Sequence, residues 1–234
     1  PIIIIISKLE KAGIIFSEIK HLKKKNVEIF YKNGKKFIDS EKKNISNRFI
    51  KLPNLDKLKK KILKNEVITF DIFDTLISRN VLNPHDIFSI VEKNINLKLK
   101  KKINFSLERR KAENECYSEF SHNFNLNQIY LKLERTLKIS KNLLYMIMQE
   151  EIKTEIKYSY PKIEIIEIFN FALKHKKKVS LISDIYLDQL TIKKILKKNN
   201  IKNYRHLLIS CELKKNKLQG DIFKYFKQIE PGKG

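Results

Sequence analysis

Residues 67–76 read VITFDIFDTL, and this stretch decides the fold. Val67–Phe70 is a short, nearly continuous apolar run, which is the pattern of a strand buried on both faces of a parallel sheet. The run ends on Asp71, so the sequence predicts an acidic side chain at the carboxyl end of a central strand. In open α/β sheets, ligands bind in the crevice outside those strand ends. Asp71 is therefore the first candidate for a functional residue.

Two more patterns of buried strands follow near the end of the chain. Val179–Ile182 leads into Ser183, and Leu207–Ile209 follows a helix that we expect over residues 188–198. A last helix is predicted over residues 221–229. Strands that alternate with helices are typical of a parallel sheet covered by helices. We therefore expect a three-layer α/β core.

A long helical stretch separates the first of these strands from the other two. Asn83-Pro84 predicts a helix start, with Asn as the N-cap and Pro at the first helical position. Apolar residues recur three and four positions apart from there to Lys176. We expect residues 81–176 to form a helical cap and residues 63–80 and 177–234 to form the core. Four aromatic residues are expected in the core of the cap: Tyr117, Phe120, Phe124 and Tyr130.

Three carboxylates of the predicted cap, Glu150, Glu151 and Glu155, lie at helical spacing. Such a group can bind a metal ion, but a solvated helix face is the more common arrangement, and we expect a solvated face here. The five histidines show no spacing of a metal cluster.

Residues 1–62 are expected to form a small N-terminal unit, which is also interpretable as the tail of an upstream module. It contains a short apolar run, Ile2–Ile6, and a predicted hairpin around Asn33-Gly34, which is a strong turn signal. A helix is predicted over Leu55–Leu63 from its apolar spacing. The function of this unit is not readable from its residues.

Charge and composition exclude several classes of protein. The chain of 234 residues has a formal net charge of +24, but its Lys residues are spread along the whole sequence. A nucleic-acid interface has a localised basic patch instead, so we expect no nucleic-acid partner. No apolar run is long enough to span a bilayer, and the two cysteines, Cys116 and Cys211, predict no disulfide framework. The expected location is the cytoplasm.

The chemistry-bearing residues are Asp71, Ser183 and Lys217, which sit at the ends of predicted strands or in the loop after one. A carboxylate, a hydroxyl and an ammonium group that meet at one sheet edge are suited to phosphoryl transfer. The carboxylate attacks phosphorus to form an aspartyl-phosphate, and the hydroxyl donates a hydrogen bond to a phosphoryl oxygen. The ammonium group offsets the negative charge of the nucleophile and of the transferring group.

These residues lie in three segments that, in this order, resemble the motifs of haloacid dehalogenase-like (HAD) hydrolases. Phe70–Leu76 (FDIFDTL) resembles the first motif, with its nucleophilic Asp followed four positions later by Thr. Ile182–Asp184 resembles the second motif, and Lys217–Phe223 (KLQGDIF) resembles the third. The 112 positions between Asp71 and Ser183 (183 − 71) resemble the helical cap that the family inserts after its first motif.

The resemblance implies a Rossmann-like HAD core and a phosphatase acting on a phosphorylated metabolite, with a sugar phosphate as one candidate. It implies catalytic roles for Asp71, Ser183 and Lys217, and substrate or phosphate binding by Thr75, Asp74, Ser183 and Lys217. It also implies an Mg²⁺ cofactor held by Asp71, by the backbone carbonyl of Phe73 and by acidic residues of a fourth motif. We expect that motif beyond residue 234, so these residues alone should bind Mg²⁺ weakly and turn over slowly.

One branch of the family combines the first motif with Ser-Asp-x-Tyr, found here at Ser183–Tyr186. That branch is often linked to glycosyltransferases of surface-polysaccharide synthesis, which makes such an enzyme a possible partner or fusion. The sequence leaves open whether Asp184 and Tyr186 support the site or cap the next helix.

Phe73 stands where phosphatases of the family carry a second Asp as general acid and base, and Asp74 comes one position later. Because side chains alternate along an extended segment, Asp74 should point away from Asp71 unless the loop twists. Two alternatives follow from Phe73: a metal-independent hydrolase of carbon–halogen bonds, or a catalytically weak binding module in polysaccharide biosynthesis.

Overall fold

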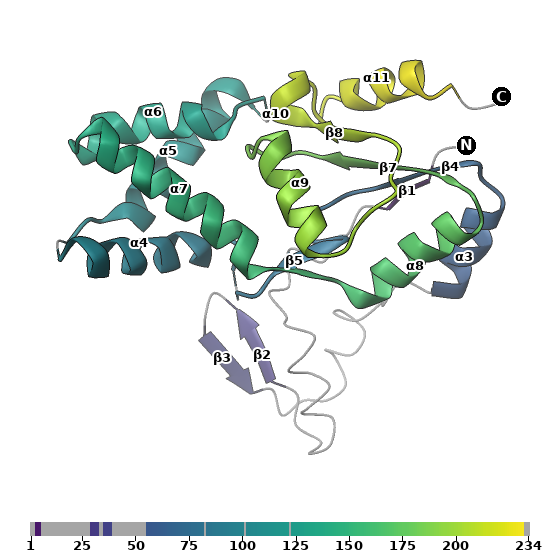
Figure 1. Ribbon diagram of the computed structural model, residues 1–234, viewed down its shortest axis with the longest axis horizontal. Helices are drawn as coiled ribbons and strands as arrows, with labels where there is room; N and C mark the ends of the chain where they lie inside the picture. Colours follow the sequence, from purple (N-terminus) through teal and green to yellow (C-terminus); the bar gives the residue numbers. More distant parts are fainter. Residues whose placement is uncertain are drawn as a thin grey trace.

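The computed structural model describes residues 3–5, 29–32, 35–38, 55–81, 83–100, 102–121 and 123–231. Its central element is a four-stranded parallel sheet in the order β1-β4-β7-β8 (Figure 1). These strands are β1 (Ile3–Ile5), β4 (Val67–Phe70), β7 (Lys178–Ser183) and β8 (Leu207–Ile209). The predicted parallel α/β core is therefore confirmed.

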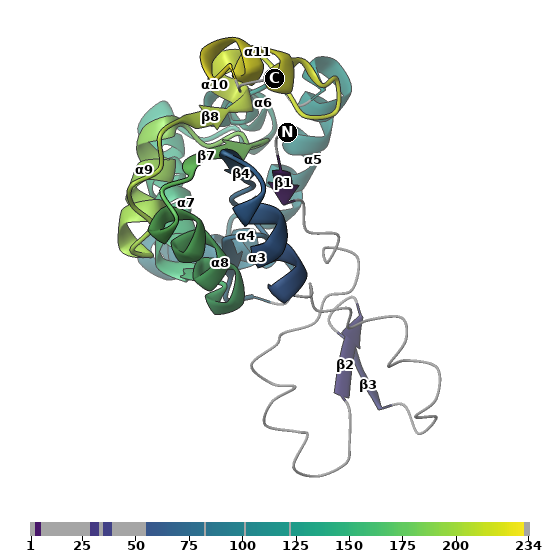
Figure 2. The ribbon, with the colours of Figure 1, turned by 90° about the vertical axis from the view of Figure 1, so that its right-hand side faces the viewer.

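Helices cover both faces of this sheet, which makes the core three-layered. On one face, Val67, Ile182 and Leu208 pack against α11 (Asp221–Ile229). The opposite face packs against α3 (Leu55–Leu63), α8 (Ile163–Lys174) and α9 (Gln189–Lys198) (Figure 2). There the ring of Phe70 meets Phe169 of α8 edge-on, with ring centroids 5.5 Å apart. Strict alternation along each strand separates the two faces.

The helical insertion consists of α4 (Asp86–Leu99), α5 (Phe105–Phe120), α6 (Leu126–Leu137) and α7 (Lys141–Tyr158). The chain enters it through β5 (Ile77–Arg79) and leaves it through β6 (Ser159–Pro161), which pair in an antiparallel ribbon. We call α4–α7 the cap. Figure 1 shows it beside the carboxyl end of the sheet.

Local signals account for the starts of the cap helices. Asn125 and Gln128 form a reciprocal capping box at the start of α6. Asn83 does mark the entry to α4, since its side chain accepts a hydrogen bond from the His85 N–H at 3.0 Å. The helix itself begins at Asp86, however, because the first turn after Pro84 is too tight for α-helical pairing.

Two segments lie in a different part of the structure from the one expected when the chain is divided at residues 62 and 176. β1, which lies in the expected N-terminal unit, pairs in parallel with β4 of the core sheet. α8, which lies in the expected cap, packs on the sheet beside α3. A core helix and a cap helix carry the same apolar period, so the sequence does not reveal which surface a helix covers.

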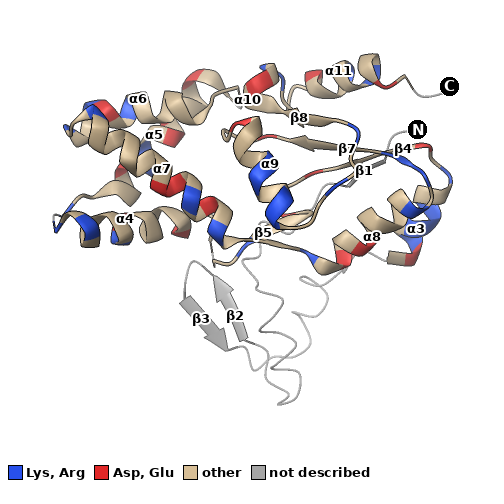
Figure 3. Ribbon diagram, viewed as in Figure 1, with Lys and Arg blue, Asp and Glu red and all other residues tan. Residues whose placement is uncertain are grey.

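The hairpin predicted in the N-terminal unit is confirmed, because β2 (Ile29–Lys32) and β3 (Lys35–Ile38) pair antiparallel. Its turn at Asn33-Gly34 lies outside the described residues. Lys and Arg residues lie on helices of both the core and the cap (Figure 3). Within the described ranges, no helix combines the length and the apolar character needed to cross a membrane.

Candidate active site

The loop after β4 brings Asp71 and Thr75 together. The chain turns back at once: Ile77 N–H donates to the Ile72 carbonyl at 2.9 Å, and Asp74 N–H donates to the Ile77 carbonyl at 2.7 Å. Asp74 makes this turn possible with a left-handed φ of +57°, a conformation that Asp tolerates better than most residues. As a result, the Thr75 hydroxyl donates to Asp71 Oδ2 at 3.2 Å.

Lys217 completes this group from a distant part of the chain. Its ammonium group forms a hydrogen-bonded ion pair with Asp71 Oδ1. The two side chains are 18% and 17% exposed, so the pair is partly shielded but open to solvent. Asp71, Thr75 and Lys217, which the sequence predicted as site residues, therefore form one contact group around a single carboxylate.

Ser183 is the last residue of β7, the strand next to β4. The register pairs Phe70 with Leu181, so Ser183 lies two positions further along the same carboxyl edge. The residue is buried. The structure thus places Ser183 at the predicted edge, one strand away from Asp71, and its role as a phosphate ligand stays a prediction.

Asp74 acts electrostatically on Arg79, the last residue of β5. Burial lowers the pKa of Arg79, but the charge of Glu155, then Tyr186, the Glu155 hydrogen bond and last the charge of Asp74 outweigh burial and raise that pKa above its usual value. Lys162 follows β6, and its Nζ donates a hydrogen bond to the Asp74 carbonyl at 2.5 Å. The loop does twist, and the charge of Asp74 acts on Arg79; its role toward a substrate stays a prediction.

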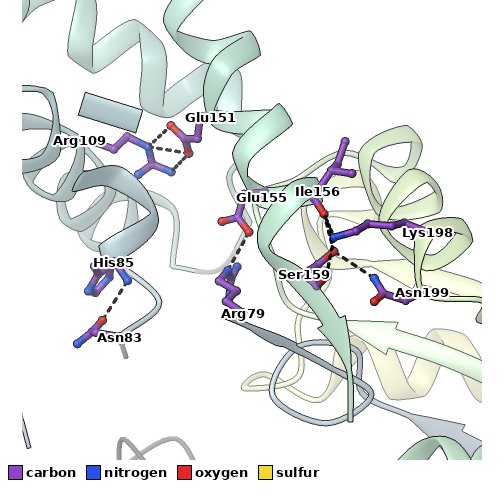
Figure 4. A network of polar contacts seen from close by, with 10 residues as sticks. All are labelled: Arg79, Asn83, His85, Arg109, Glu151, Glu155, Ile156, Ser159, Lys198 and Asn199. Carbon is purple, nitrogen blue, oxygen red and sulfur yellow. Dashed lines mark hydrogen bonds and ion pairs between the residues drawn. The ribbon is translucent and has the colours of Figure 1, made fainter. Parts of the chain in front are cut away.

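Phe73 places an apolar ring where phosphatases of the HAD family carry a second Asp. The ring is buried, and the Arg79 guanidinium lies over it at 4.4 Å from the ring centre. Arg79 is held in turn by Glu155 of α7, with 2.8 Å between Nε and Oε2 (Figure 4). Arg79 was not among the site residues predicted from the sequence. Its cation over the aromatic face of Phe73 is a favourable contact.

The described residues provide only part of a magnesium site. Mg²⁺ prefers six oxygen ligands that include one or two carboxylates. Asp71 offers one carboxylate, whose two oxygens already bind Lys217 and Thr75, and Phe73 offers a carbonyl. No group of three or more His, Cys, Asp or Glu residues capable of holding a metal occurs in the described parts of the chain.

The Ser183–Tyr186 segment, whose role the sequence left open, joins the site to the cap. Asp184 Oδ2 accepts a hydrogen bond from the Lys217 backbone N–H at 2.9 Å. Tyr186 is buried against the cap: its carbonyl accepts from Leu126 N–H at 2.9 Å, and the Arg109 guanidinium lies 4.8 Å from its ring centre. The N-cap of α9 is Asp188, so neither Asp184 nor Tyr186 caps that helix.

The expected solvated face of Glu150, Glu151 and Glu155 is wrong for two of the three. Glu151 and Glu155 are buried, and only Glu150 reaches the surface, where it binds Lys98. Arg109 is fully buried and donates to both oxygens of Glu151 at 3.1 Å (Figure 4). Arg109 also donates to Glu113 at 2.7 Å, and Tyr130 donates to Glu151 at 2.8 Å. These four residues, Arg109, Glu113, Tyr130 and Glu151, are called the buried cap cluster below.

The aromatic residues expected in the core of the cap divide in a similar way. Phe124 and Tyr130 are buried, and Phe120 packs at the edge of the core. Tyr117 is exposed, although its ring meets Phe124 edge-on at 4.7 Å.

Comparison with known proteins rests on structure, because no family model and no curated protein sequence matches the chain. A putative beta-phosphoglucomutase from Thermotoga maritima is similar in structure, with a TM-score of 0.50 and 13% identity over 70% of this chain and 69% of that protein. The two proteins share an α/β fold. A dehalogenase structure also matches, at 14% identity and a TM-score of 0.46 over 72% of this chain and 73% of that one. At such identities the likeness concerns the fold alone, and the predicted fold class is confirmed.

Proposed function

We propose that this HAD-like protein is a phosphohydrolase that forms an aspartyl-phosphate on Asp71 from a small phosphorylated metabolite. One observation carries the proposal: the Asp71 carboxylate lies at the carboxyl end of a central strand, between the ammonium group of Lys217 and the hydroxyl of Thr75. A cation and a hydroxyl beside one accessible carboxylate can stabilise the charge of the nucleophile and of the phosphoryl group that it receives.

In the first step, an Asp71 carboxylate oxygen attacks phosphorus, and the bond from phosphorus to the leaving oxygen breaks. Lys217 stabilises the negative charge on the transferring group. Phe73 carries no proton, so the leaving oxygen takes its proton from water. General acid help is worth about 10²–10⁴-fold, so substrates with a good leaving group are favoured.

In the second step, water attacks the phosphorus of the aspartyl-phosphate. The bond from phosphorus to Asp71 breaks, and the carboxylate is regenerated. Inorganic phosphate leaves, and the proton that the attacking water loses passes to bulk water. The hydroxyls of Thr75 and Ser183 are proposed to donate hydrogen bonds to the phosphoryl oxygens. The cap beside the strand ends is proposed to exclude bulk water and to select the substrate.

The setting of the reaction belongs to the same proposal. We infer an Mg²⁺ requirement from the resemblance to HAD phosphatases and keep a sugar phosphate as the first candidate substrate. A cytoplasmic location is supported by Cys116 and Cys211, which are both free thiols. Association with a glycosyltransferase stays a prediction.

The test is an assay of phosphate release by the full-length protein. Phosphorylated sugars and small phosphomonoesters are incubated with wild type and with Asp71→Asn, each with Mg²⁺ and with EDTA. Release that requires Asp71 supports the proposal, and its loss in EDTA supports the cofactor. Absence of Asp71-dependent release from every substrate would overturn the proposal.

A second candidate is favoured by one observation: the residue two positions after the nucleophile, Phe73, carries a buried apolar ring in place of a carboxylate. Hydrolysis of a carbon–halogen bond needs no proton on its leaving group, and the same Asp71 carboxylate would attack carbon. Halide release from a 2-haloacid that persists in EDTA would favour this candidate. Binding of a sugar phosphate without any release would favour the binding module.

A further inference from the structure

The backbone around Lys217 is held by hydrogen bonds within its own loop and by one from the loop after β7. Asn216 N–H donates to Asp221 Oδ1 at 2.7 Å, and Gln219 N–H donates to the Asn216 side-chain oxygen at 2.8 Å. Lys217 N–H donates to Asp184 at 2.9 Å. The turn that carries the Lys217 ammonium group is therefore built on the carboxamide of the residue before it.

That carboxamide also reaches the cap. Asn216 is fully buried, and its Nδ2 donates to Oδ1 of Asn123 at 3.3 Å. Asn123 lies in the connection between α5 and α6, and its backbone carbonyl accepts from Lys214 Nζ at 3.2 Å. A buried amide without a partner destabilises its surroundings, so this side chain prefers the position in which both of its ends are bound.

We propose that Asn216 is a positioning residue that couples the docking of the cap to the placement of Lys217 on Asp71. One end of its carboxamide forms the turn that carries Lys217, and the other end binds the cap at Asn123. When the cap moves away from the core, Asn123 moves with it, so the buried Asn216 amide loses its acceptor and the turn loses its support. Lys217 then spends less time on Asp71. The catalytic meaning of this coupling rests on the proposed phosphoryl transfer.

Substitutions at Asn123 test the coupling without changing the loop of Lys217. Asn123→Ala removes the acceptor for Asn216, whereas Asn123→Asp keeps an acceptor at the same place. The contact with Lys214 uses the backbone carbonyl, so both variants retain it. Asn94→Ala is the matched control. The Asn94 side-chain amide also links parts of the cap, because it donates to Glu150 at 2.9 Å, and Asn94 is far from Lys217 in sequence.

Two quantities are measured for each variant. The first is kcat for phosphate release, which should fall roughly fivefold in Asn123→Ala with KM nearly unchanged, the order expected when one hydrogen bond is lost. The second is the acetylation rate of Lys217 relative to exposed Lys193, measured by mass spectrometry after brief treatment with acetic anhydride. Asp71 shields Lys217, so the relative rate should rise severalfold in Asn123→Ala. Asn123→Asp and Asn94→Ala should behave like wild type in both measurements.

Wild-type values of kcat and of Lys217 acetylation in Asn123→Ala would overturn the coupling. Equal changes in Asn123→Asp or in Asn94→Ala would also overturn it, because they would indicate general loosening of the cap. The acetylation measurement needs no turnover. A chain that releases no phosphate would therefore refute the proposed function, while the coupling would still be decided by Lys217 reactivity.

Discussion

Two ion pairs of the same chemistry lie in different surroundings in this protein. At the sheet edge, Asp71 binds Lys217, and the two side chains are 17% and 18% exposed. In the cap, Glu151 binds Arg109, and both side chains are completely buried. Each carboxylate also accepts a hydroxyl hydrogen bond, from Thr75 in the first case and from Tyr130 in the second.

The difference separates a carboxylate that can react from one that holds a structure together. Arg109 and Glu151 find their partners within the protein, and the rings of Phe88 and Tyr186 both lie within 4.8 Å of the Arg109 guanidinium. Neither side chain is accessible to solvent. Asp71 and Lys217 lie at the carboxyl edge of the sheet and remain partly exposed, as the proposed binding of a phosphate requires. Exposure, rather than residue type, therefore distinguishes the pair proposed to react from the pair that lies inside the cap.

The largest effect is expected on activity at the sheet edge. Asp71→Asn should lower turnover by roughly 10⁴-fold or more, the order of loss when a covalent nucleophile is removed. Its free energy of unfolding should change by less than about 1 kcal/mol, because a partly exposed ion pair contributes little. Phosphate release and urea unfolding give the two values. Asp188→Asn is the control, because Asn can still cap the N-terminus of α9. A large loss of stability in Asp71→Asn would show that the ion pair of Asp71 and Lys217 is structural.

The opposite result is expected in the buried cap cluster. Arg109→Met leaves the buried carboxylates of Glu151 and Glu113 without their cation, so the free energy of unfolding should fall by about 3–5 kcal/mol. Arg110→Met, at the exposed neighbouring position, should change it by less than about 0.5 kcal/mol. Urea unfolding followed by circular dichroism measures both. If the two variants are equally stable, the cluster does not hold the cap together.

The same contrast explains what the sequence could predict. Local patterns located the residues of the sheet edge. They are the apolar runs that stop at Asp71 and at Ser183, and the spacing from Lys217 to Phe223. The helix over Leu55–Leu63 and the strand over Leu207–Ile209 were found with their observed bounds, because apolar period and flanking polar residues fix them. Parallel strands then bring their ends together by topology.

The buried cap cluster could not be found in this way, because Arg109 and Glu151 are 42 positions apart. Two signals were nevertheless present. Glu151 and Glu155 continue the inward stripe of Leu144 and Ile147, so they lie on the buried face of α7. Arginine is also scarce, with six among the 50 basic residues, and it suits buried ion pairs better than lysine.

A smaller effect is expected for the cation at the sheet edge. Lys217→Ala should lower kcat by about 10²–10³-fold, because one group that stabilises the transferring charge is lost while the nucleophile remains. Lys215→Ala tests the choice among neighbouring lysines and should stay within about threefold of wild type, since substitutions away from such contacts have small effects. Steady-state rates of phosphate release measure both. Equal losses in the two variants would mean that general positive charge, and not the contact with Asp71, matters.

The smallest effect concerns the hydroxyl in the buried cap cluster. Tyr130→Phe removes the hydrogen bond to Glu151 and should cost about 1.5–3 kcal/mol of stability near neutral pH. Burial, and then the charge of Glu151, raise the pKa of Tyr130 well above its usual value of 10.0. The folded phenol therefore keeps its proton when the unfolded one loses it. Its contribution is intact below about pH 10 and is lost above it, at about 1.4 kcal/mol per pH unit.

Wild type should consequently lose stability more steeply than Tyr130→Phe as the pH rises above about 10, and the difference between them should shrink. Tyr186, whose pKa burial also raises, is present in both proteins, so the difference in slope reports Tyr130 alone. Guanidinium unfolding at a series of alkaline pH values measures the slopes. Parallel slopes would show that the phenol titrates as in the unfolded chain, which requires water in the cluster. In that case Glu151 would be as accessible as Asp71, and exposure could not be what separates the two pairs.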